Sequence, residues 1–349
     1  MLKKLIPIFL CLTLALGVGC SKQPETLSVD KGDEPTASQP AEKEKEKVLN
    51  PLTGIKEEDL TAEKAGNRPV AIMVNNMNIA QPVQTGLTKA DVIYETEVEG
   101  GITRLMAVYQ DISSVEKIGA VRSCRYAYID LALGHNAIYV HHGADPKFAT
   151  PHLADTDHLN VGENNGAARI SNGLAKEHTL YAYGDKVWET LITSNRTIKN
   201  KNNATWLNFA SETSPVTLDN TATSVSVPFS NSYKTTFKYD EASGRYVRYF
   251  NGTERKDYVT NETITVKNVF VLTTTIGYYT NIDKHRNISL ESGSGYYFVN
   301  GTYTPITWSK GAANNSFVFK TADGGELTVN PGDSWVCIAD KNTSKPVIE

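Results

Sequence analysis

The chain has 349 residues, of which 40% are hydrophobic and 21% are charged, a balance typical of globular proteins and sufficient for about two domains with sizeable cores. Its formal net charge is −4. A net acidic chain is a poor general binder of polyanions, which argues against a nucleic-acid-binding protein but leaves room for a local basic pocket.

The N-terminus has the pattern of an export signal. Lys3 and Lys4 precede an uncharged apolar run over 5–18, which is too short to span a bilayer comfortably. The run leads into LGVGCS at 16–21, which resembles a bacterial lipobox with its Leu one position further from the Cys than usual. We expect residues 1–19 to be a signal peptide and Cys20 to carry acyl chains such as palmitate, which would anchor the protein to the extracytoplasmic face of the cell membrane. An ordinary secreted protein is the alternative.

Residues 20–50 are expected to be the lipidated Cys and a disordered tether. The segment holds three prolines and the charged run EKEKEK at 42–47, with almost no large apolar side chains. Such a composition cannot offset the entropy of ordering by burial, so the segment acts as a spacer from the membrane.

Residues 51–210 are predicted to form an α/β domain with a mixed sheet and helices. Short apolar or alternating runs indicate strands, and an apolar stripe with helical spacing indicates a helix that starts at Arg122. The predicted strands are 69–74, 90–98, 102–109 and 137–140, and the predicted helices are 122–133 and 185–192. Because apolar and polar residues alternate in 90–98, that strand is expected to be half-buried. The order of strand, helix and strand is typical of an α/β layer.

Residues 211–349 are predicted to form a second, mostly antiparallel β domain. Asn-Gly pairs at 251–252 and 300–301 are strong hairpin signals. The predicted strands are 266–275, 295–299, 316–320 and 335–339. Trp308 and Trp335 could form a sugar-stacking platform, with core packing as the alternative.

The cysteines predict no disulfide framework. Cys11 would leave with the signal, Cys20 would carry lipid, and only Cys124 and Cys337 would remain in the body. We expect both to be small buried side chains, with a bridge across the domains as the alternative.

A basic cluster is the strongest candidate for a ligand site. Gly100 and Gly101 would let the backbone approach a ligand, and Arg104 follows them in a strand. Arg122 and Arg125 are three residues apart at the expected start of a helix, whose free N–H groups favour anions. Guanidinium groups suit phosphate or carboxylate, so these five residues predict an anion-binding site. The alternative is an internal ion network with the nearby acids Asp91, Glu95, Glu97 and Glu99.

Histidines provide a weaker candidate for catalysis. His141 and His142 end a predicted strand, where α/β sheets usually bind ligands. With Glu95 or Glu99 as a partner, either could act as a general acid or base. The chain has no HExxH motif or His-x-x-x-His spacing, P-loop or dinucleotide fingerprint, so we expect no metal site and no cofactor.

The body also resembles a known family, the YerB-like bacterial lipoproteins. The likeness spans about residues 50–340 and rests on these segments: GLTKADVIYE at 86–95, EGGITR at 99–104, GAVRSCR at 119–125, YVHHG at 139–143, GRYVR at 244–248, KNV at 267–269, TWSK at 307–310 and NPGDSW at 330–335. The chain departs from the family pattern at Ala120, where Pro is usual, and at 176–179. The resemblance implies an exported lipoprotein with paired N- and C-terminal domains of unknown function, and it implies no activity.

Two functions fit these observations. The first is a membrane-anchored module, without enzymatic activity, that binds an anionic envelope component or small molecule. The alternative is a hydrolase or transferase that acts on an envelope polymer with a His and carboxylate site. In the first, the β domain would act as a lid or as an element that docks a partner. We expect no nucleic-acid partner, and the sequence does not identify a protein partner.

Overall fold

The computed structural model describes residues 46–201, 205–280 and 284–349, so the predicted signal peptide, Cys20 and nearly all of the tether lie outside the described residues. The described chain begins with a small hairpin of β1 (Val48–Leu49) and β2 (Lys56–Glu57), followed by the short helix α1 (Ala62–Ala65). No helix among the described residues is long and apolar enough to cross a membrane.

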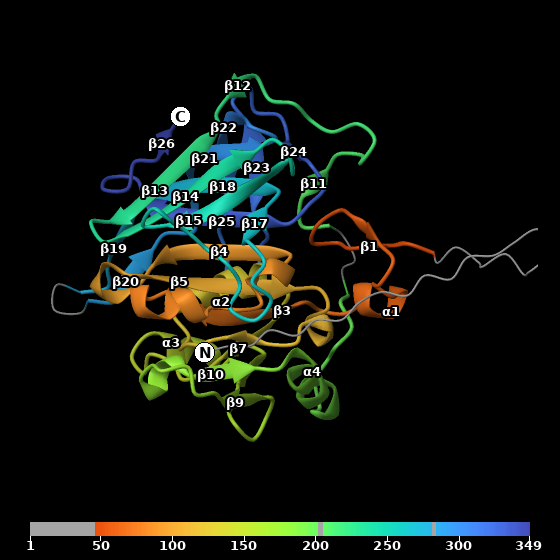
Figure 1. Cartoon of the computed structure of the whole chain (residues 1–349), viewed down its shortest axis with the longest axis vertical. Coiled ribbons are helices and arrows are strands. Elements are labelled where there is room, and N and C mark those ends of the chain that lie inside the picture. The colour runs from red at the N-terminus through yellow and green to blue at the C-terminus, as the bar shows by residue number, and fades with distance from the viewer. Residues whose placement is uncertain (1–45, 202–204, 281–283) are drawn as a thin grey trace, which may run out of the picture. The chain divides into compact units, whose positions relative to one another are not determined.

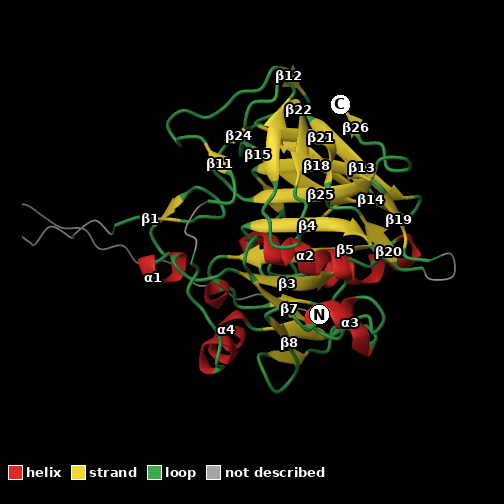
Figure 2. Ribbon diagram, turned by 180° about the vertical axis from the view of Figure 1, so that it is seen from behind, coloured by secondary structure: helices red, strands yellow, loops and turns green. Residues whose placement is uncertain are grey.

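A mixed sheet of eleven strands runs through both halves of the chain (Figures 1 and 2). Its order is β12 (Asn220–Thr221), β22 (Thr302–Ser309), β21 (Ser292–Val299), β18 (Asn268–Thr274), β25 (Ser334–Asp340), β4 (Val92–Glu97), β5 (Thr103–Tyr109), β3 (Val70–Asn75), β7 (Ile138–His141) and β8 (His158–Asn160), with β23 (Val318–Thr321) paired to β22.

The strand β25 joins the two halves of this sheet. It lies between β18 and β4 and runs parallel to both, with Cys337 opposite Glu95. Both thiols in the described body, Cys124 and Cys337, are buried and unbridged. The main sheet is therefore continuous across the boundary expected near residue 210, and the described residues belong to one compact unit.

A second, antiparallel sheet covers one face of the main sheet in the C-terminal half. It contains β16 (Thr253–Glu254), β15 (Arg245–Phe250), β14 (Tyr233–Asp240), β13 (Ser224–Ser230) and β26 (Val347–Ile348), with β17 (Thr265–Val266) beside β15. The ring of Phe237 meets the buried indole of Trp335 edge-on at 5.5 Å between ring centres. The two sheets thus share an aromatic and aliphatic core.

Helices and a small sheet cover the N-terminal half. The helix α2 (Tyr126–Gly134) lies on the opposite face, where the hydroxyl of Tyr128 bonds the backbone of Thr96 and Arg104. The remaining α-helices and strands are α3 (Ala149–Leu153), α4 (Gly184–Thr193), a sheet of β6 (Ile118–Gly119), β10 (Leu180–Ala182) and β9 (Ala167–Arg169), and the pairs β11 (Asn208–Phe209) with β24 (Thr328–Val329) and β19 (Ile276–Tyr278) with β20 (Arg286–Ile288).

The predicted fold class is confirmed: a mixed sheet with a few helices comes first, and a mostly antiparallel β part follows. The helix predicted from Arg122 instead begins at Tyr126. The reason is tertiary pairing, because the backbone N–H groups of Arg122 and Cys124 donate to the carbonyls of Met73 and Gly143.

The structure also decides two expectations about burial: the half-buried strand is wrong, and core packing of the two tryptophans is confirmed. The strand β4 is not half-buried but buried at all six positions, since α2 covers one of its faces and the second sheet approaches the other. Trp308 and Trp335 are 2% and 0% exposed, so both pack in the core and neither can form a sugar platform.

Candidate functional site

One edge of the main sheet gathers most of the predicted site residues. The strands β18, β25, β4, β3, β7 and β8 all run in the same direction, so their carboxyl ends lie at this edge. Because β5 is antiparallel to its neighbours, Arg104 near its start lies at the same edge. The carboxyl edge of parallel strands is where α/β sheets usually bind ligands.

An open cleft with basic side chains lies at this edge, and we call it the basic cleft. It is lined by Val121, Arg122, Ser123, His142, Gly143, Arg169, Lys176, Glu177 and Leu180, and it has a volume of about 430 Å³. Three of these side chains are cationic and only Glu177 is acidic. The cleft therefore carries a local positive charge on a net acidic chain.

Arg122 is held in the basic cleft by neutral groups. Its guanidinium donates to the carbonyl of Glu177 at 3.0 Å and lies 3.8 Å from the sulfur of Met77. Across the described parts of the chain, no carboxylate comes within 4.0 Å of it. Burial lowers the pKa of Arg122, the charge of Glu177 opposes that effect, and Arg125 adds to it. The positive charge of Arg122 is thus only partly balanced by the protein.

Arg169 and His142 form the opposite part of the basic cleft. The imidazole Nδ1 of His142 lies 2.7 Å from the carbonyl of Val161, so the proton belongs on Nδ1 and Nε2 is an acceptor. Arg169, in β9, approaches this Nε2 at 3.4 Å and donates to the carbonyl of Lys176 at 2.6 Å. Its only carboxylate neighbour in the described chain is the exposed Glu163, at 4.0 Å.

Arg125 is paired with an acid, unlike Arg122. It is the residue before α2, and Glu99 accepts from its Nε and, at 3.0 Å, from its Nη2. Burial works to raise the pKa of Glu99, but the hydrogen bond and charge of Arg125, aided by Arg104, outweigh burial and lower it. For Arg125 the alternative of an internal ion network is the arrangement that the structure shows.

Arg104 is buried within electrostatic range of Arg122 and Arg125. It is 5% exposed and donates to the carbonyl of Ser123 at 2.5 Å. Burial lowers its pKa to about 10, with Arg125 contributing in the same direction. The three predicted arginines are therefore close enough to influence one another electrostatically, but only Arg122 lines the basic cleft.

Gly100 and Gly101 form the turn between β4 and β5. Both have positive φ, at 71° and 69°, which explains the choice of glycine. The carbonyl of Gly101 accepts from the hydroxyl of Ser230 at 2.7 Å. The two glycines serve a turn and contact the second sheet, and they do not line the basic cleft.

Glu95 lies in the core rather than in a cleft. It is fully buried and accepts hydrogen bonds from Asn76, Thr103, Thr235 and Trp335. Burial raises the pKa of this carboxyl, while the charge of Arg248 opposes the effect. Since its donors come from both sheets and from the loop after β3, Glu95 connects these layers.

His141 has a histidine as its partner instead of a carboxylate. Its Nε2 lies 3.0 Å from Nδ1 of His158, and its Nδ1 lies 2.7 Å from the carbonyl of Gly143. In the described structure no hydrogen bond or ion pair joins His141 or His142 to Glu95 or Glu99. The predicted His and carboxylate pair is therefore not assembled from these four residues.

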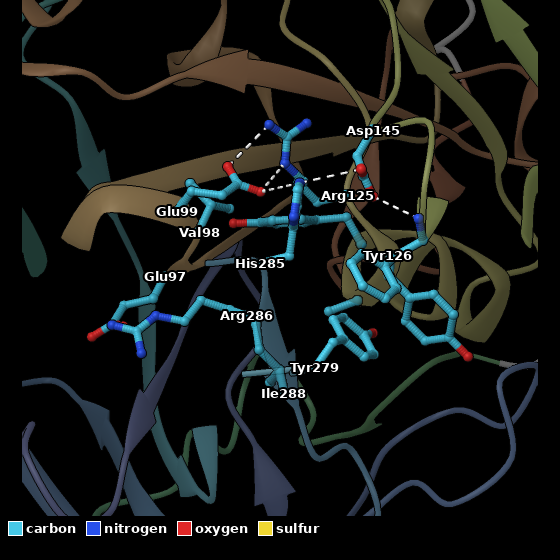
Figure 3. A pocket seen from close by; sticks show the side chains of 13 residues that line it. Glu97, Val98, Glu99, Arg125, Tyr126, Asp145, Tyr279, His285, Arg286 and Ile288 are labelled. Carbon is cyan, nitrogen blue, oxygen red and sulfur yellow. Dashed lines mark hydrogen bonds and ion pairs between the residues drawn. The ribbon is translucent and has the colours of Figure 1, made fainter. Parts of the chain in front are cut away.

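A different set of charges gathers around Glu99, in the pocket of Figure 3. His285 lies 3.4 Å from Glu99 and 3.2 Å from Asp145, and Arg286 pairs with Glu97 at 2.6 Å. The space open to water in this pocket is only about 20 Å³, little more than one water molecule requires.

The pocket of Figure 3 is best described as a joint between the two halves of the chain. His285 and Arg286 come from the loop and strand of the β19–β20 pair, while their acidic partners end β4 or follow β4 and β7. The rings of Tyr279 and Phe148 stack at 4.2 Å between centres and complete it. We call this set of contacts the ionic joint.

The sequence did not indicate Arg169 and Lys176 in the basic cleft, or His285 and Arg286 in the ionic joint. These four residues come from loops or short strands far along the chain from Arg122 and His141. Asp145 lies only three residues after His142, and the sequence offered it as an acid near the histidines but not as a partner of His285. Its side chain accepts from the backbone N–H groups at 147–149, as Asp does in turns.

The fold and its edge site define a two-part protein built on one continuous mixed sheet. Two family models match it, described as the N-terminal domain of a protein of unknown function (DUF3048), over residues 52–198, and the corresponding C-terminal domain, over residues 225–336. The chain belongs to the DUF3048 family.

Known relatives agree with this assignment. The chain is 31% identical over 308 residues to YerB of Bacillus subtilis (strain 168), named a candidate lipoprotein, and the match covers 84% of this chain and 86% of that protein. It also resembles the crystal structure of YerB from Bacillus subtilis, with a TM-score of 0.73 and 27% identity over 86% of this chain and 100% of that one. The resemblance to YerB-like lipoproteins is confirmed, and the name of this relative accords with membrane association. The signal cleavage and acylation predicted at Cys20 lie outside the described residues.

Proposed function

We propose that this protein is an extracytoplasmic binding module that is anchored to the membrane through Cys20 and holds an anionic ligand in the basic cleft. The observation that supports the proposal is Arg122, a guanidinium in an open cleft that no carboxylate of the described residues pairs with directly. Arg125, Arg245 and Arg286 differ from it, because each is paired directly with an acid.

The chemistry of the cleft favours an anion with oxygen acceptors. Arg122 and Arg169 offer guanidinium donors that match phosphate or carboxylate oxygens, and Lys176 adds a flexible point charge. With about 430 Å³, the cleft admits far more than the roughly 20 Å³ of the ionic joint, so a ligand enters without moving packed side chains.

An envelope hydrolase or transferase remains the alternative function. It would require a His within hydrogen-bond reach of a carboxylate, facing the same cleft as the arginines. In the described chain, Nε2 of His142 faces Arg169, and Glu95 is enclosed in the core. These contacts favour binding over catalysis.

Thermal unfolding with added anions tests the proposal. The test protein is the chain from residue 20 with Cys20→Ser, compared with Arg122→Ala in the same background and with Lys186→Ala, which removes an exposed positive charge on α4. Phosphate should raise Tm of the parent and of Lys186→Ala, and this rise should be largely lost in Arg122→Ala. At a phosphate concentration of 100 times Kd, binding would raise the free energy of unfolding by about 2.7 kcal/mol.

Phosphate and sulfate also stabilise proteins without binding to a site, so the difference between variants is the informative quantity. Equal stabilisation of the parent and of Arg122→Ala would refute the proposed site. Turnover of an envelope polymer that survives Arg122→Ala but is lost in His142→Ala would favour the alternative.

A further inference from the structure

A second cleft, separate from the basic cleft, lies where β7 and β8 end. Its volume is about 410 Å³, and its lining includes His141, Thr150, Thr156, His158 and Asn160. We call it the histidine cleft. In the parallel pairing of β7 with β8, His158 lies opposite Tyr139 and His141 lies opposite Asn160, so the two histidines are diagonal neighbours on adjacent strands.

From the geometry of these two rings, we propose that His141 and His158 form a binding site for a late first-row divalent metal ion such as Cu²⁺ or Zn²⁺. Nε2 of His141 and Nδ1 of His158 lie 3.0 Å apart. Two nitrogens that each lie about 2.0–2.1 Å from one metal ion, at angles between square-planar and tetrahedral, are separated by roughly 2.9–3.4 Å. The observed separation falls in this range without any movement of the backbone.

The contacts of His141 fix its imidazole in a tautomer that suits a metal ligand. Its Nδ1 lies 2.7 Å from the carbonyl of Gly143, which places the ring proton on Nδ1 and leaves the lone pair of Nε2 directed at His158. Metal-binding histidines almost always have such a partner on the other ring nitrogen, which fixes the tautomer and the ring orientation. Gly143 supplies this carbonyl from a tight loop with φ of +75°.

Imidazole binds metal ions in its neutral form, through the ring nitrogen that carries no proton.

In the metal-free state one proton must lie between the two nitrogens. Because the proton of His141 is on Nδ1, His158 carries its own on Nδ1 and donates it to His141. Metal binding requires His158 to change tautomer, with the proton lost from Nδ1 to solvent and regained on Nε2. Rotation of both rings then turns the two lone pairs away from each other and toward the ion, and no net proton is released.

Solvent must complete the coordination shell. Among the described residues, no group of three or more His, Cys, Asp or Glu side chains gathers as a metal site. The ion is therefore held by two imidazoles and by water within the histidine cleft. Nitrogen ligands generally bind Cu²⁺ more tightly than Zn²⁺, and the same order is expected here. Mg²⁺ and Ca²⁺ prefer oxygen ligands, so they should not compete for the site.

The experiment is calorimetric titration of Cu²⁺ and Zn²⁺ into the chain from residue 20 with Cys20→Ser, purified without a histidine tag. The parent should bind one ion. Loss of a residue that only hydrogen-bonds to a metal ligand weakens metal binding by roughly 10- to 100-fold, so loss of the ligand itself in His158→Ala should weaken it by at least as much. His152→Ala is the matched control, because His152 is similarly half-buried but pairs with Asp130. That variant should bind as the parent does.

Electron paramagnetic resonance of the Cu²⁺ form gives a second measurement. The parent spectrum should show two coupled nitrogens and the His158→Ala spectrum one. If His158→Ala does not fold, His158→Gln replaces it, since the shorter amide can preserve a hydrogen bond to His141 but not the two-imidazole spectrum. Absence of binding in the parent, or unchanged affinity and spectrum in the variants, would show that the two histidines form only a hydrogen bond.

Discussion

The carboxylate of Glu99 holds the guanidinium of Arg125 through two nitrogens, 26 residues apart in the sequence. This pair fixes the turn after β4 against the residue that precedes α2. Arg122, only three residues earlier, has no such acid among the described residues and instead lines the basic cleft. Two arginines of one short motif thus have different roles.

Arg125→Ala should therefore destabilise the fold without removing anion binding. The loss of a charge-assisted hydrogen-bonded pair should reduce the free energy of unfolding by about 1.5–3 kcal/mol. Urea unfolding measures this loss, and a double-mutant cycle with Glu99→Ala isolates the coupling between the two side chains. Loss of phosphate stabilisation in Arg125→Ala with the fold intact would place Arg125 in the binding site instead.

Glu95 should behave as a structural residue. In Glu95→Gln, the amide group faces the donors from Thr235, Thr103 and Trp335, so at least one buried hydrogen bond is lost. The expected cost is about 1–3 kcal/mol in urea unfolding. Glu254→Gln, at an exposed position, is the control and should be neutral. A Glu95→Gln protein of unchanged stability that no longer bound phosphate would contradict this role.

The sequence predicted where the strands lie along the chain better than it predicted which strands pair with one another. Apolar runs and Asn-Gly turns were sufficient to locate β3, β5, β18 and β21, because these signals are local. The insertion of β25 between β18 and β4 was not predicted, since side-chain alternation does not specify which distant strand is the neighbour. The same long-range pairing explains why β4 is buried on both faces.

Only part of the candidate site was predicted, because long-range strand pairing also brings its residues together. Arg122 and His142 were both singled out, and the structure brings them into one cleft. Arg169 and Lys176 come from a separate loop and short strand, and only the pairing of β9 with β10 brings them there. The helix expected at Arg122 was wrong because local periodicity does not report the long-range hydrogen bonds that this segment donates to the carbonyls of Met73 and Gly143.

Limited proteolysis tests whether the two halves of the sequence act as separate domains. Because β25 lies between β18 and β4, a cut near residue 210 should leave two fragments that stay together in gel filtration under native conditions. Cleavage within residues 21–50 should come first and leave a resistant body. Fragments that separate without denaturant would contradict a continuous sheet.

Acylation at Cys20 is open to a direct test. Cys20→Ser should move the protein from the membrane fraction to the soluble extracytoplasmic fraction and abolish palmitate labelling, because the variant has no thiol to receive the acyl chains. Cys337→Ser is the matched control, since this thiol is buried in β25 and should not affect anchoring. A Cys20→Ser protein that stays in the membrane would show that the lipobox interpretation is wrong.

Asp91 should make the stability of the protein depend on pH. Burial raises the pKa of this carboxyl from 3.8 to about 7, while hydrogen bonds from Gln110 and Asn50 oppose the shift and Glu57 adds to it. The folded chain thus holds this proton more tightly than the unfolded chain. The stabilisation is fully present below about pH 4 and is lost as the pH rises through about 7.

Asp91→Asn should flatten this dependence, because the amide cannot ionise. One pKa unit corresponds to 1.36 kcal/mol, but Asp91 keeps part of its surface in solvent, so the expected loss between pH 4 and 8 is only about 1–2 kcal/mol. Urea unfolding at several pH values measures it in the parent and in Asp91→Asn, with Asp219→Asn as an exposed control. Histidines also titrate in this range, so the difference between the parent and Asp91→Asn is the decisive quantity. Parallel pH profiles for these two proteins would show that the carboxyl of Asp91 ionises in the folded chain as it does in the unfolded one.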